Sequence, residues 1–328
     1  MNTTTRPYEV QAGSPLVLDA DAVRSLLPKL NVRQLLEDMF RSRAEGRAVQ
    51  PPQTLTLFPE GAGDFISYLG VLGNAGVFGV KMSPYIKTDG RPIISAWTSL
   101  MSMHTGQPLL WCDSALLTVE RTAGATALAI DYLAPVHSKR LALIGCGAVG
   151  QAHLKHVAKL RAWSEIRVYA ADMNDAIRAA MTQIDTRVTV SDDTMHCIAD
   201  ADVVMLCTSS ATPVISIDDL NRPALITSIS TNAVNAHEIP PAALHQMDVF
   251  CDDKQTTPAS AGEMVLATQL HNWDPIAVHG DLADLASGKV SRPTYDKPVF
   301  FRSIGLGLED VAIAHALLEL AQQSSPNQ

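Results

Sequence analysis

One segment constrains the fold of this chain more than any other, the run LALIGCGAVG from Leu141 to Gly150. An apolar strand leads directly into three glycines spaced G-x-G-x-x-G, and the residues that follow have helical periodicity. The first glycine of such a loop permits a tight turn, the second lets a pyrophosphate approach the backbone, and the third allows close packing of helix on strand. The phosphates are expected at the helix N-terminus, where N–H groups favour an anion. The segment therefore predicts a Rossmann dinucleotide-binding unit whose cofactor contacts include Gly145, Gly147, Ala148, Val149 and Gly150.

The residue that distinguishes NAD from NADP is expected about 20 residues after the last glycine, at the end of the second strand. Ala170 occupies that place, and Asp172 follows shortly after it. An acid there accepts a bond from the ribose hydroxyl of NAD, whereas an uncharged residue removes the repulsion against the 2′-phosphate of NADP. No Lys or Arg is adjacent to hold that phosphate. Both residues are predicted to contact the cofactor, and the choice between NAD and NADP stays open.

The pattern of the whole chain predicts an α/β fold. Its 328 residues suggest two domains, and Pro135 marks a change of pattern. Before Pro135, helices are expected after Asp19 and Asn31, then a meander of strands, then a helix from Glu120 to Leu133. After it, short Val/Ile-rich strands alternate with helices, which predicts a parallel sheet buried on both faces. A last helix, 308–322, is expected to return to the first domain. The predicted domains are 1–135 with 303–328, and a Rossmann domain at 136–302.

Composition excludes several classes of function. Acidic residues outnumber basic ones by 34 to 25, which gives a net charge of −9, and no stretch is rich in Lys or Arg. Binding to nucleic acid or to an anionic membrane surface therefore lacks its electrostatic basis. No apolar run reaches about 18 residues and the N-terminus is polar, so a membrane span and a signal peptide are not expected. The five scattered cysteines predict reduced, buried thiols in a cytoplasmic protein and no metal site.

Several motifs together resemble the ornithine cyclodeaminase/mu-crystallin family of NAD(P)-dependent proteins. They are Gly79-Val-Lys81, the run LTVERTA at 117–123, the glycine loop, Cys207-Thr-Ser209 with Pro213-Val-Ile215, and Ser303-Ile-Gly305 with Glu309-Asp310. The resemblance spans nearly the whole chain. It implies an N-terminal α/β domain for substrate binding and dimerisation, a Rossmann domain, and a C-terminal helix that completes the first domain. It also implies a homodimer.

The resemblance further implies basic residues that bind the carboxylate of the substrate. Lys81 and Arg121 match two such positions, and a guanidinium suits a carboxylate because it can donate two bonds. Each also has a structural interpretation, as a surface lysine or as an ion-paired arginine. A third basic position of the family is filled here by Gln53, which can only hydrogen-bond a carboxylate or amide. We expect Lys81, Arg121 and Gln53 to contact the substrate, with Lys81 also in a catalytic role.

The catalytic aspartate of the cyclodeaminases is replaced by Asn232 in the register that the resemblance gives. An amide cannot exchange a proton as a carboxylate does, so Asn232 argues against cyclodeamination and suits simple hydride transfer to a C=N bond. His237, beside Glu238, is a candidate proton donor or partner for a basic substrate tail. The remaining predicted cofactor contacts are Thr122, Thr208, Ser209, Ser303 and Gly305.

The sequence thus predicts an NAD(P)H-dependent reductase that converts a cyclic ketimine, such as 1-pyrroline-2-carboxylate or 1-piperideine-2-carboxylate, into L-proline or L-pipecolate. Three alternatives stay open. They are an L-amino acid dehydrogenase of the arginine or alanine type, an ornithine cyclodeaminase, and a non-catalytic binding protein like the mu-crystallins. The expected partners are a small imino or amino acid and a second copy of the chain.

Overall fold

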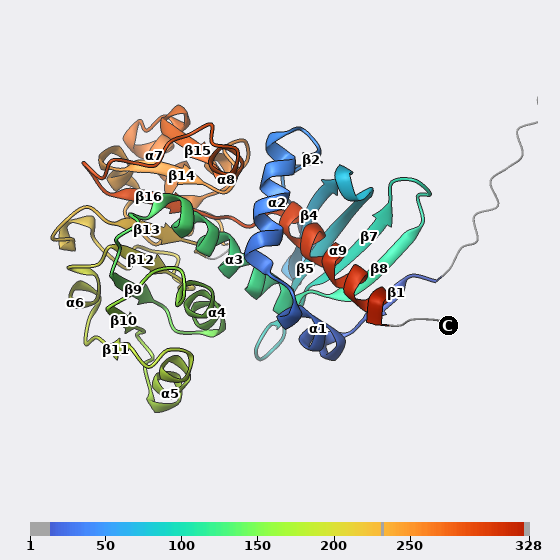
Figure 1. The fold of residues 1–328 in the computed structure, drawn as a ribbon, viewed down its shortest axis with the longest axis horizontal. Helices are drawn as coiled ribbons and strands as arrows, with labels where there is room; N and C mark the ends of the chain where they lie inside the picture. Colours follow the sequence, from blue (N-terminus) through green and yellow to red (C-terminus); the bar gives the residue numbers. More distant parts are fainter. Residues whose placement is uncertain (1–13, 231–232, 325–328) are drawn as a thin grey trace, which may run out of the picture.

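The computed structural model describes residues 14–230 and 233–324, and two eight-stranded sheets organise them. Figure 1 shows the sheets on opposite sides of the molecule, with helices α2 (Val32–Ala44) and α3 (Ala115–Leu133) between them. All residues of the first sheet precede Pro135 and all residues of the second follow it. The α/β class expected from the sequence is confirmed. The exact domain limits stay a prediction.

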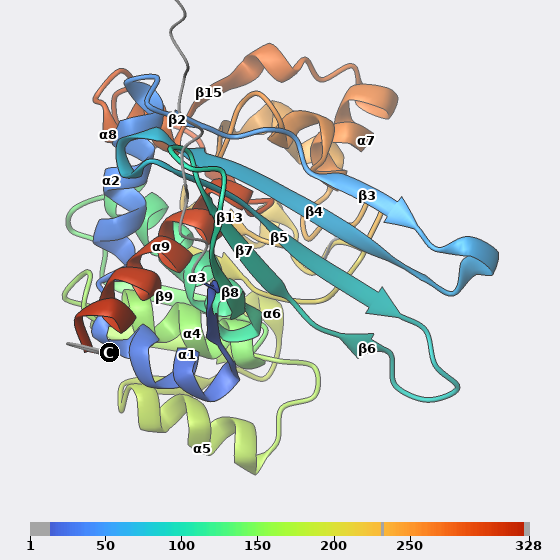
Figure 2. The same cartoon turned by 90° about the vertical axis from the view of Figure 1, so that its right-hand side faces the viewer.

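The first sheet is mainly antiparallel, as the expected meander requires. Its order is β1-β8-β7-β5-β4-β2, with β3 paired to β4 and β6 paired to β5. The strands are β1 (Leu16–Leu18), β2 (Ala48–Val49), β3 (Thr54–Leu57), β4 (Gly63–Leu72), β5 (Val77–Ile86), β6 (Ile93–Ile94), β7 (Trp97–Ser102) and β8 (Pro108–Asp113). Figure 2 shows β3 to β6 extending away from the helices as a long ribbon.

The helices of this half begin close to where the sequence placed them. Helix α1 (Ala20–Leu26) is capped by Asp19, whose carboxylate accepts from the N–H of Ala22 at 2.9 Å. Helix α3 is a correction, because it begins at Ala115 and not near Glu120. The side chain of Ser114, the residue before the helix, does not cap it, and its hydroxyl is hydrogen-bonded to Thr98 Oγ1 at 2.6 Å.

The second sheet is parallel throughout, in the order β11-β10-β9-β12-β13-β16-β14-β15. Its strands are β9 (Arg140–Ile144), β10 (Glu165–Tyr169), β11 (Val188–Val190), β12 (Val203–Leu206), β13 (Leu225–Ser228), β14 (Asp248–Cys251), β15 (Val278–Asp281) and β16 (Val299–Arg302). The helices are α4 (Ala148–Val157), α5 (Asp175–Ile184), α6 (Thr194–Ile198), α7 (Gly262–His271) and α8 (Leu282–Ala286). Every residue of β12 and β13 is buried, which confirms a sheet covered on both faces. The chain order reverses beside β9, where a crevice forms at the carboxyl ends of the strands.

The last helix, α9 (Gly307–Ser324), lies on the first sheet, as expected (Figure 1). Its backbone touches β4 so closely that a Cβ on Gly70 would come within 2.7 Å of Leu308 Cα. The buried side chain of Gln50 accepts from the N–H of Leu308 at 2.9 Å. This contact fixes the N-terminus of α9 against the segment between β2 and β3.

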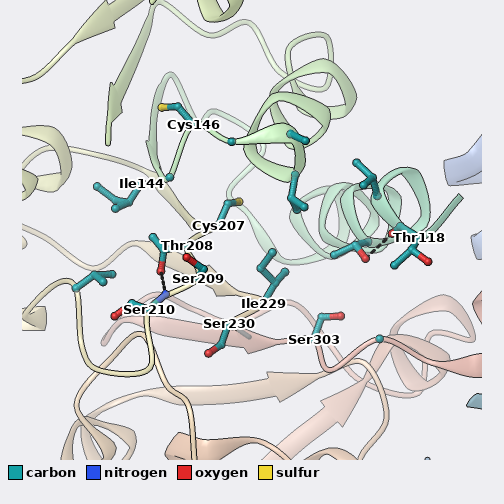
Figure 3. Close-up of a pocket in the computed structure, with 18 of the residues that line it drawn as sticks. Thr118, Ile144, Cys146, Cys207, Thr208, Ser209, Ser210, Ile229, Ser230 and Ser303 are labelled. Atoms are coloured by element: carbon teal, nitrogen blue, oxygen red, sulfur yellow. Dashed lines mark hydrogen bonds between the residues drawn. The ribbon is translucent and has the colours of Figure 1, made fainter. Parts of the chain in front are cut away.

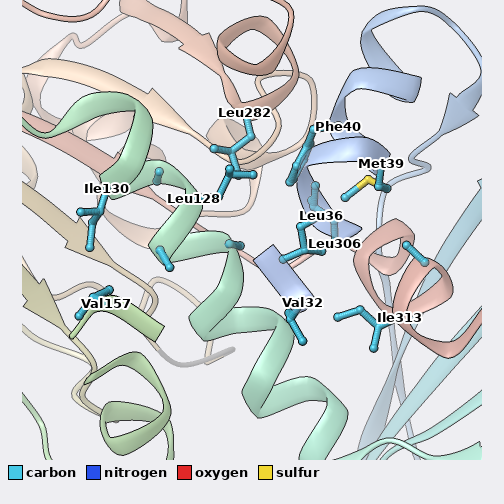
Figure 4. Close-up of a cluster of buried hydrophobic side chains, with 14 of the residues drawn as sticks. Val32, Leu36, Met39, Phe40, Leu128, Ile130, Val157, Leu282, Leu306 and Ile313 are labelled. Atoms are coloured by element: carbon cyan, nitrogen blue, oxygen red, sulfur yellow. The ribbon is translucent and has the colours of Figure 1, made fainter. Parts of the chain in front are cut away.

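Figure 4 shows the core where α2, α3, α8 and α9 meet. Leu36 and Phe40 of α2 are completely buried there with Leu128 of α3 and Ile313 of α9. The helices approach closely because α3 is rich in small residues, and a Cβ on Gly124 would lie 2.7 Å from Val32 Cγ1. This packing holds the two sheets in a fixed relation around the crevice.

The five cysteines are buried and unpaired, as predicted. Among the residues that the structure describes, no helix is both long and apolar enough to span a membrane.

Candidate functional site

A cavity of about 900 Å³ lies at the carboxyl ends of β9, β10, β12 and β13 and continues to α3, β4 and β5. Figure 3 shows Ser209, Ile229 and Ser303 around it, with Thr118 of α3 at the side of the first sheet. The cavity therefore joins the predicted cofactor crevice to the predicted substrate residues.

The glycine loop forms one wall of the cavity, and each glycine has a separate structural reason. Gly145 has φ +97°, and a Cβ there would lie 2.5 Å from the carbonyl oxygen of Cys207. A Cβ on Gly150 would lie 1.9 Å from the carbonyl oxygen of Gly145.

Gly147 differs from the other two glycines, because no atom of the described residues beyond its two chain neighbours lies within 4 Å of the place that its Cβ would occupy. It caps α4 without a side-chain bond among the described residues, so the first-turn N–H groups are available to an anion. The loop fits the pyrophosphate of a dinucleotide.

The other predicted cofactor residues line the same cavity, with Ala148 and Val149 beside the glycines and Thr122 on α3. Ala170 and Asp172 follow β10, and both line the cavity. Their positions therefore do not distinguish NAD from NADP. Thr208 and Ser209 follow β12, and Ser303 and Gly305 follow β16.

Glu238 fixes the ends of β12 and β13 at the cavity. Its Oε1 accepts from the N–H and the hydroxyl of Thr208 at 2.8 and 2.7 Å. Its Oε2 accepts from the hydroxyl of Ser228 at 2.7 Å and from the N–H of Ser230 at 2.9 Å. The side chain is completely buried. Four donors thus hold this carboxylate inside the protein, where it positions the two strand ends and does not face the substrate.

Ser230 is strained and lines the cavity. Its φ is +48°, a left-handed conformation that costs a residue with a Cβ about 1–2 kcal/mol. Its hydroxyl oxygen is buried without a hydrogen-bond partner among the described residues. Nothing in the sequence indicates that Ser230 belongs to the site, because only its backbone conformation in the folded protein distinguishes it.

A buried charge cluster closes the substrate end of the cavity. Lys81 Nζ lies 2.9 Å from Asp310 Oδ2 and donates to Thr118 Oγ1 at 3.3 Å. Arg121 donates from Nε to Asp310 Oδ1 and from Nη1 to Glu309 Oε2, both at 3.2 Å. Lys81 is 1% exposed and Arg121 is 4% exposed, so neither is a surface residue. Both cations line the cavity, as the carboxylate prediction requires, and both also have an acidic partner.

Burial dominates the titration of this cluster. It lowers the pKa of Lys81 to about 8, and the charge of Arg121 acts in the same direction. Burial raises the pKa of Glu309 to about 8, although Arg121 opposes this. For Arg121, burial lowers the pKa, but the carboxylates of Asp310 and Glu309 outweigh it and raise the net value. Near neutral pH the cluster therefore contains groups that can change their protonation state.

Asp252 organises the segment that follows β16. Its Oδ2 accepts from the hydroxyl of Ser303 at 3.0 Å and from the N–H groups of Ile304 and Gly305 at 2.7 and 2.9 Å. Gly305 has φ +75°, and a Cβ there would lie 2.0 Å from Arg121 Nη1. Gly305 therefore leaves room for the guanidinium of Arg121, and its predicted contact with the cofactor stays a prediction.

Two predicted residues, Gln53 and His237, do not line the cavity in the described part of the chain. Gln53 precedes β3, and its buried Oε1 has no partner among the residues described. His237 is half-buried, with Nδ1 2.7 Å from the carbonyl oxygen of Asn235. Neither belongs to the described lining. Asn232 lies outside the described residues. Their proposed roles stay predictions.

Sequence reasoning assigned no role to Asp252, and it named Glu309-Asp310 only as part of a motif. The signal was weak but present, since two adjacent acids precede an apolar run, 311–314, shortly after the Ser303–Gly305 segment. Over residues 14–230 and 233–324 no group of three or more His, Cys, Asp or Glu side chains is arranged to hold a metal ion.

Comparison with known proteins places these features in a family. The model of the ornithine cyclodeaminase/mu-crystallin family matches residues 14–325. An NAD(P)H-dependent anabolic L-arginine dehydrogenase from Pseudomonas aeruginosa is 50% identical over 313 residues, which cover 95% of this chain and 99% of the relative. An alanine dehydrogenase from Archaeoglobus fulgidus is 26% identical over 308 residues, covering 93% and 95%.

Solved structures have the same fold. Thermococcus litoralis Δ1-pyrroline-2-carboxylate reductase, in complex with NADH and L-proline, superposes with a TM-score of 0.86 at 21% identity, covering 94% of this chain and 98% of that one. A probable ornithine cyclodeaminase from Bordetella pertussis gives 0.85 at 26% identity, covering 96% and 100%. Because the family model matches nearly the whole chain and a member of 50% identity covers 95% of it, the chain belongs to the ornithine cyclodeaminase/mu-crystallin family.

Proposed function

We propose that this protein is an NAD(P)H-dependent L-amino acid dehydrogenase whose substrate is arginine or a similar basic amino acid. The broader class is an NAD(P)-dependent oxidoreductase that acts on amino or imino acids. The arginine assignment rests on one observation, the 50% identity to the arginine dehydrogenase over 95% of the chain. In the direction of synthesis, a 2-oxo acid, ammonia, NAD(P)H and a proton give the amino acid, NAD(P)⁺ and water.

The chain's own residues have separable roles in this proposal. The nicotinamide, when bound, supplies or accepts the hydride. The glycine loop holds the pyrophosphate, while Lys81 and Arg121 bind the substrate carboxylate and so orient the adjacent carbon. Lys81, with its pKa lowered to about 8 by burial, is placed to donate or accept a proton near neutral pH.

Initial rates of nucleotide oxidation and reduction test the proposal. The panel comprises L-arginine, L-lysine, L-alanine and L-ornithine with NAD and NADP, and the corresponding 2-oxo acids with ammonia and NADH or NADPH. The proposal requires the highest kcat/KM with arginine or its oxo acid. Turnover of alanine alone would overturn the substrate assignment while preserving the class.

The cyclic-ketimine reductase predicted from the sequence is the second candidate. Pyrroline-2-carboxylate reductases are among the relatives, at 24% identity, and the reduced bond is the same C=N bond. A cyclic imine carries its nitrogen within the substrate, so its reduction needs no added ammonia. A higher kcat/KM with 1-pyrroline-2-carboxylate than with any oxo acid would select this candidate.

The remaining alternatives give different signatures in the same panel. An ornithine cyclodeaminase releases ammonia from ornithine without net nucleotide turnover. A binding protein binds dinucleotide and turns over none of these compounds. We favour neither, because 50% identity is to a dehydrogenase.

We also propose a cytoplasmic homodimer in which the first sheet forms the interface. Leu69 and Phe78 lie on neighbouring strands of that sheet and are 41% and 37% exposed. Gly70, which alternates with Leu69, faces α9, so Leu69 points away from the helix. A relative of known structure, the archaeal alanine dehydrogenase, is a dimer.

A further inference from the structure

Five buried ionisable side chains form a cluster at the substrate end of the cavity, where Lys81 and Arg121 line it and the three carboxyl groups lie behind them. They come from four parts of the chain and comprise two cations and three carboxyl groups: Lys81, Arg121, Asp252, Glu309 and Asp310. When all are ionised, the cluster has one negative charge in excess. A substrate carboxylate bound to Lys81 and Arg121 would bring a second. Uncompensated charge is costly in a buried site, so binding favours protonation of one carboxyl group.

The hydrogen bonds indicate which carboxyl group accepts the proton. Asp310 faces two cations, Lys81 and Arg121, which stabilise its ionised form. Asp252 accepts from Ser303, Ile304 and Gly305 on Oδ2, and from Thr257 and Asp253 on Oδ1. These five donors favour the ionised form and oppose the effect of burial, which raises the pKa of Asp252 on balance.

Glu309 has the weakest support for a negative charge. Its Oε2 accepts two long bonds, from Arg121 at 3.2 Å and from the N–H of Leu306 at 3.3 Å. Its Oε1 is buried and has no partner among the described residues. The side chain is completely buried. A proton on Glu309 Oε1 disturbs none of the contacts that the structure shows. Asp310 Oδ2 also lacks a hydrogen bond among the described residues, but it is ion-paired with Lys81, and both oxygens of Asp252 accept hydrogen bonds.

We propose that Glu309 takes up a proton when a substrate carboxylate binds at Lys81 and Arg121, so that carboxylate and proton bind together. Glu309 is thus a positioning residue, because it acts through Arg121. The inference rests on the proposed function in one respect, that the ligand is a carboxylate bound by these two cations.

The groups that face Glu309 set the pH range of this coupling. They are Arg121 from α3, Lys81 from β5 beside the ring of Tyr68 on β4, Asp252 after β14, and Asp310 on its own helix. The pKa of Glu309, raised by burial to about 8, increases further when an anion binds nearby. Proton uptake is therefore largest above pH 8 and absent near pH 6, where Glu309 is already protonated. Lys81 has a pKa lowered to about 8 and is the competing proton acceptor.

Isothermal titration calorimetry measures the coupling directly. Protein saturated with NADPH is titrated with L-arginine, L-alanine and acetate at pH 6 and pH 9, each in two buffers of different ionisation enthalpy. The wild type should take up close to one proton per carboxylate at pH 9 and almost none at pH 6. Glu309→Gln should lose most of the uptake at pH 9. Glu319→Gln, a change at an exposed acid on the same helix, should retain it.

The outcomes separate this proposal from its rival and from the proposed function. Uptake that persists in Glu309→Gln and disappears in Lys81→Gln would assign the proton to Lys81 and overturn the proposal. Binding of acetate but of no amino acid would contradict the proposed function and leave the test of Glu309 valid. If none of the carboxylates binds, both are wrong.

A wild-type measurement covers the case in which Glu309→Gln does not fold. The Kd for acetate should rise by up to roughly tenfold per pH unit above about pH 8. Infrared difference spectra at pH 9 should show a protonated carboxyl band on acetate binding. A Kd independent of pH, or spectra without that band, would contradict the proposal.

Discussion

At the scale of single residues, Gly147 separates cofactor binding from folding. Its missing side chain faces open space, unlike those of Gly145 and Gly150, which face backbone atoms. Gly147→Val should therefore fold but obstruct the pyrophosphate, and NAD(P)H affinity should fall at least about tenfold. Fluorescence titration of NAD(P)H measures the affinity, and thermal melting checks the fold. A folded variant with unchanged affinity would show that the loop does not hold the dinucleotide.

Arg121 has two roles that different substitutions separate. Arg121→Ala leaves Glu309 and Asp310 buried without their guanidinium, which should lower the free energy of unfolding by about 3–5 kcal/mol. Arg121→Lys keeps a positive charge but loses the planar fork, so it should cost less stability and raise KM for the amino acid about tenfold or more. Urea unfolding and steady-state kinetics measure the two effects. If Arg121→Lys has a normal KM, Arg121 is structural only.

At the scale of elements, His153 joins α4 of the Rossmann unit to α3, which precedes Pro135. Its Nε2 lies 2.9 Å from Thr126 Oγ1 on α3, and its Nδ1 lies 2.8 Å from the carbonyl oxygen of Val149. Burial lowers the pKa of His153 to about 4. The folded state thus disfavours the protonated ring.

The sign of the pH effect follows from this lowered pKa. The contribution of neutral His153 to the free energy of unfolding is fully present above about pH 6.5, the ordinary pKa of histidine. It is lost as the pH falls toward 4. Wild-type protein should lose roughly 3 kcal/mol of unfolding free energy over that interval through this residue. His153→Gln, which cannot be protonated, should show a flatter profile in urea unfolding between pH 7 and pH 4. Equal slopes for the two proteins would refute the assignment.

The sequence predicted most elements and only part of the site, for physical reasons. The glycine loop and the alternation of short apolar strands with helices after Pro135 are local patterns, and the parallel sheet that they predict is present. Strand β15 has little signal in the sequence because His279, Gly280 and Asp281 lack the β-branched pattern of a strand. The pairing of Arg121 with Asp310 joins residues 189 apart in sequence, and no local pattern indicates such a contact. The role of Glu238 likewise depends on strand ends that only the folded sheet brings together.

At the scale of the whole molecule, the exposed face of the first sheet is predicted to pair with a second copy. Phe78→Glu places a charge in the middle of that face, where it would be desolvated on association. The wild type should have twice the chain mass in solution by light scattering, and the variant should be largely monomeric. Lys29→Glu, a change on a short helix outside the sheet, is the matched control. A monomeric wild type would contradict the proposed dimer.

The central claim is that one cavity brings a nicotinamide and an amino acid precursor together for hydride transfer. Isotope transfer tests it most directly. The protein is incubated with NADPH or NADH deuterated at the transferable position of the nicotinamide, together with ammonia and the 2-oxo acid of arginine. Mass spectrometry of the product should find L-arginine with one deuterium at Cα. Oxidised nucleotide without deuterium in any amino acid, or no product from this oxo acid or from the cyclic imines, would contradict the account.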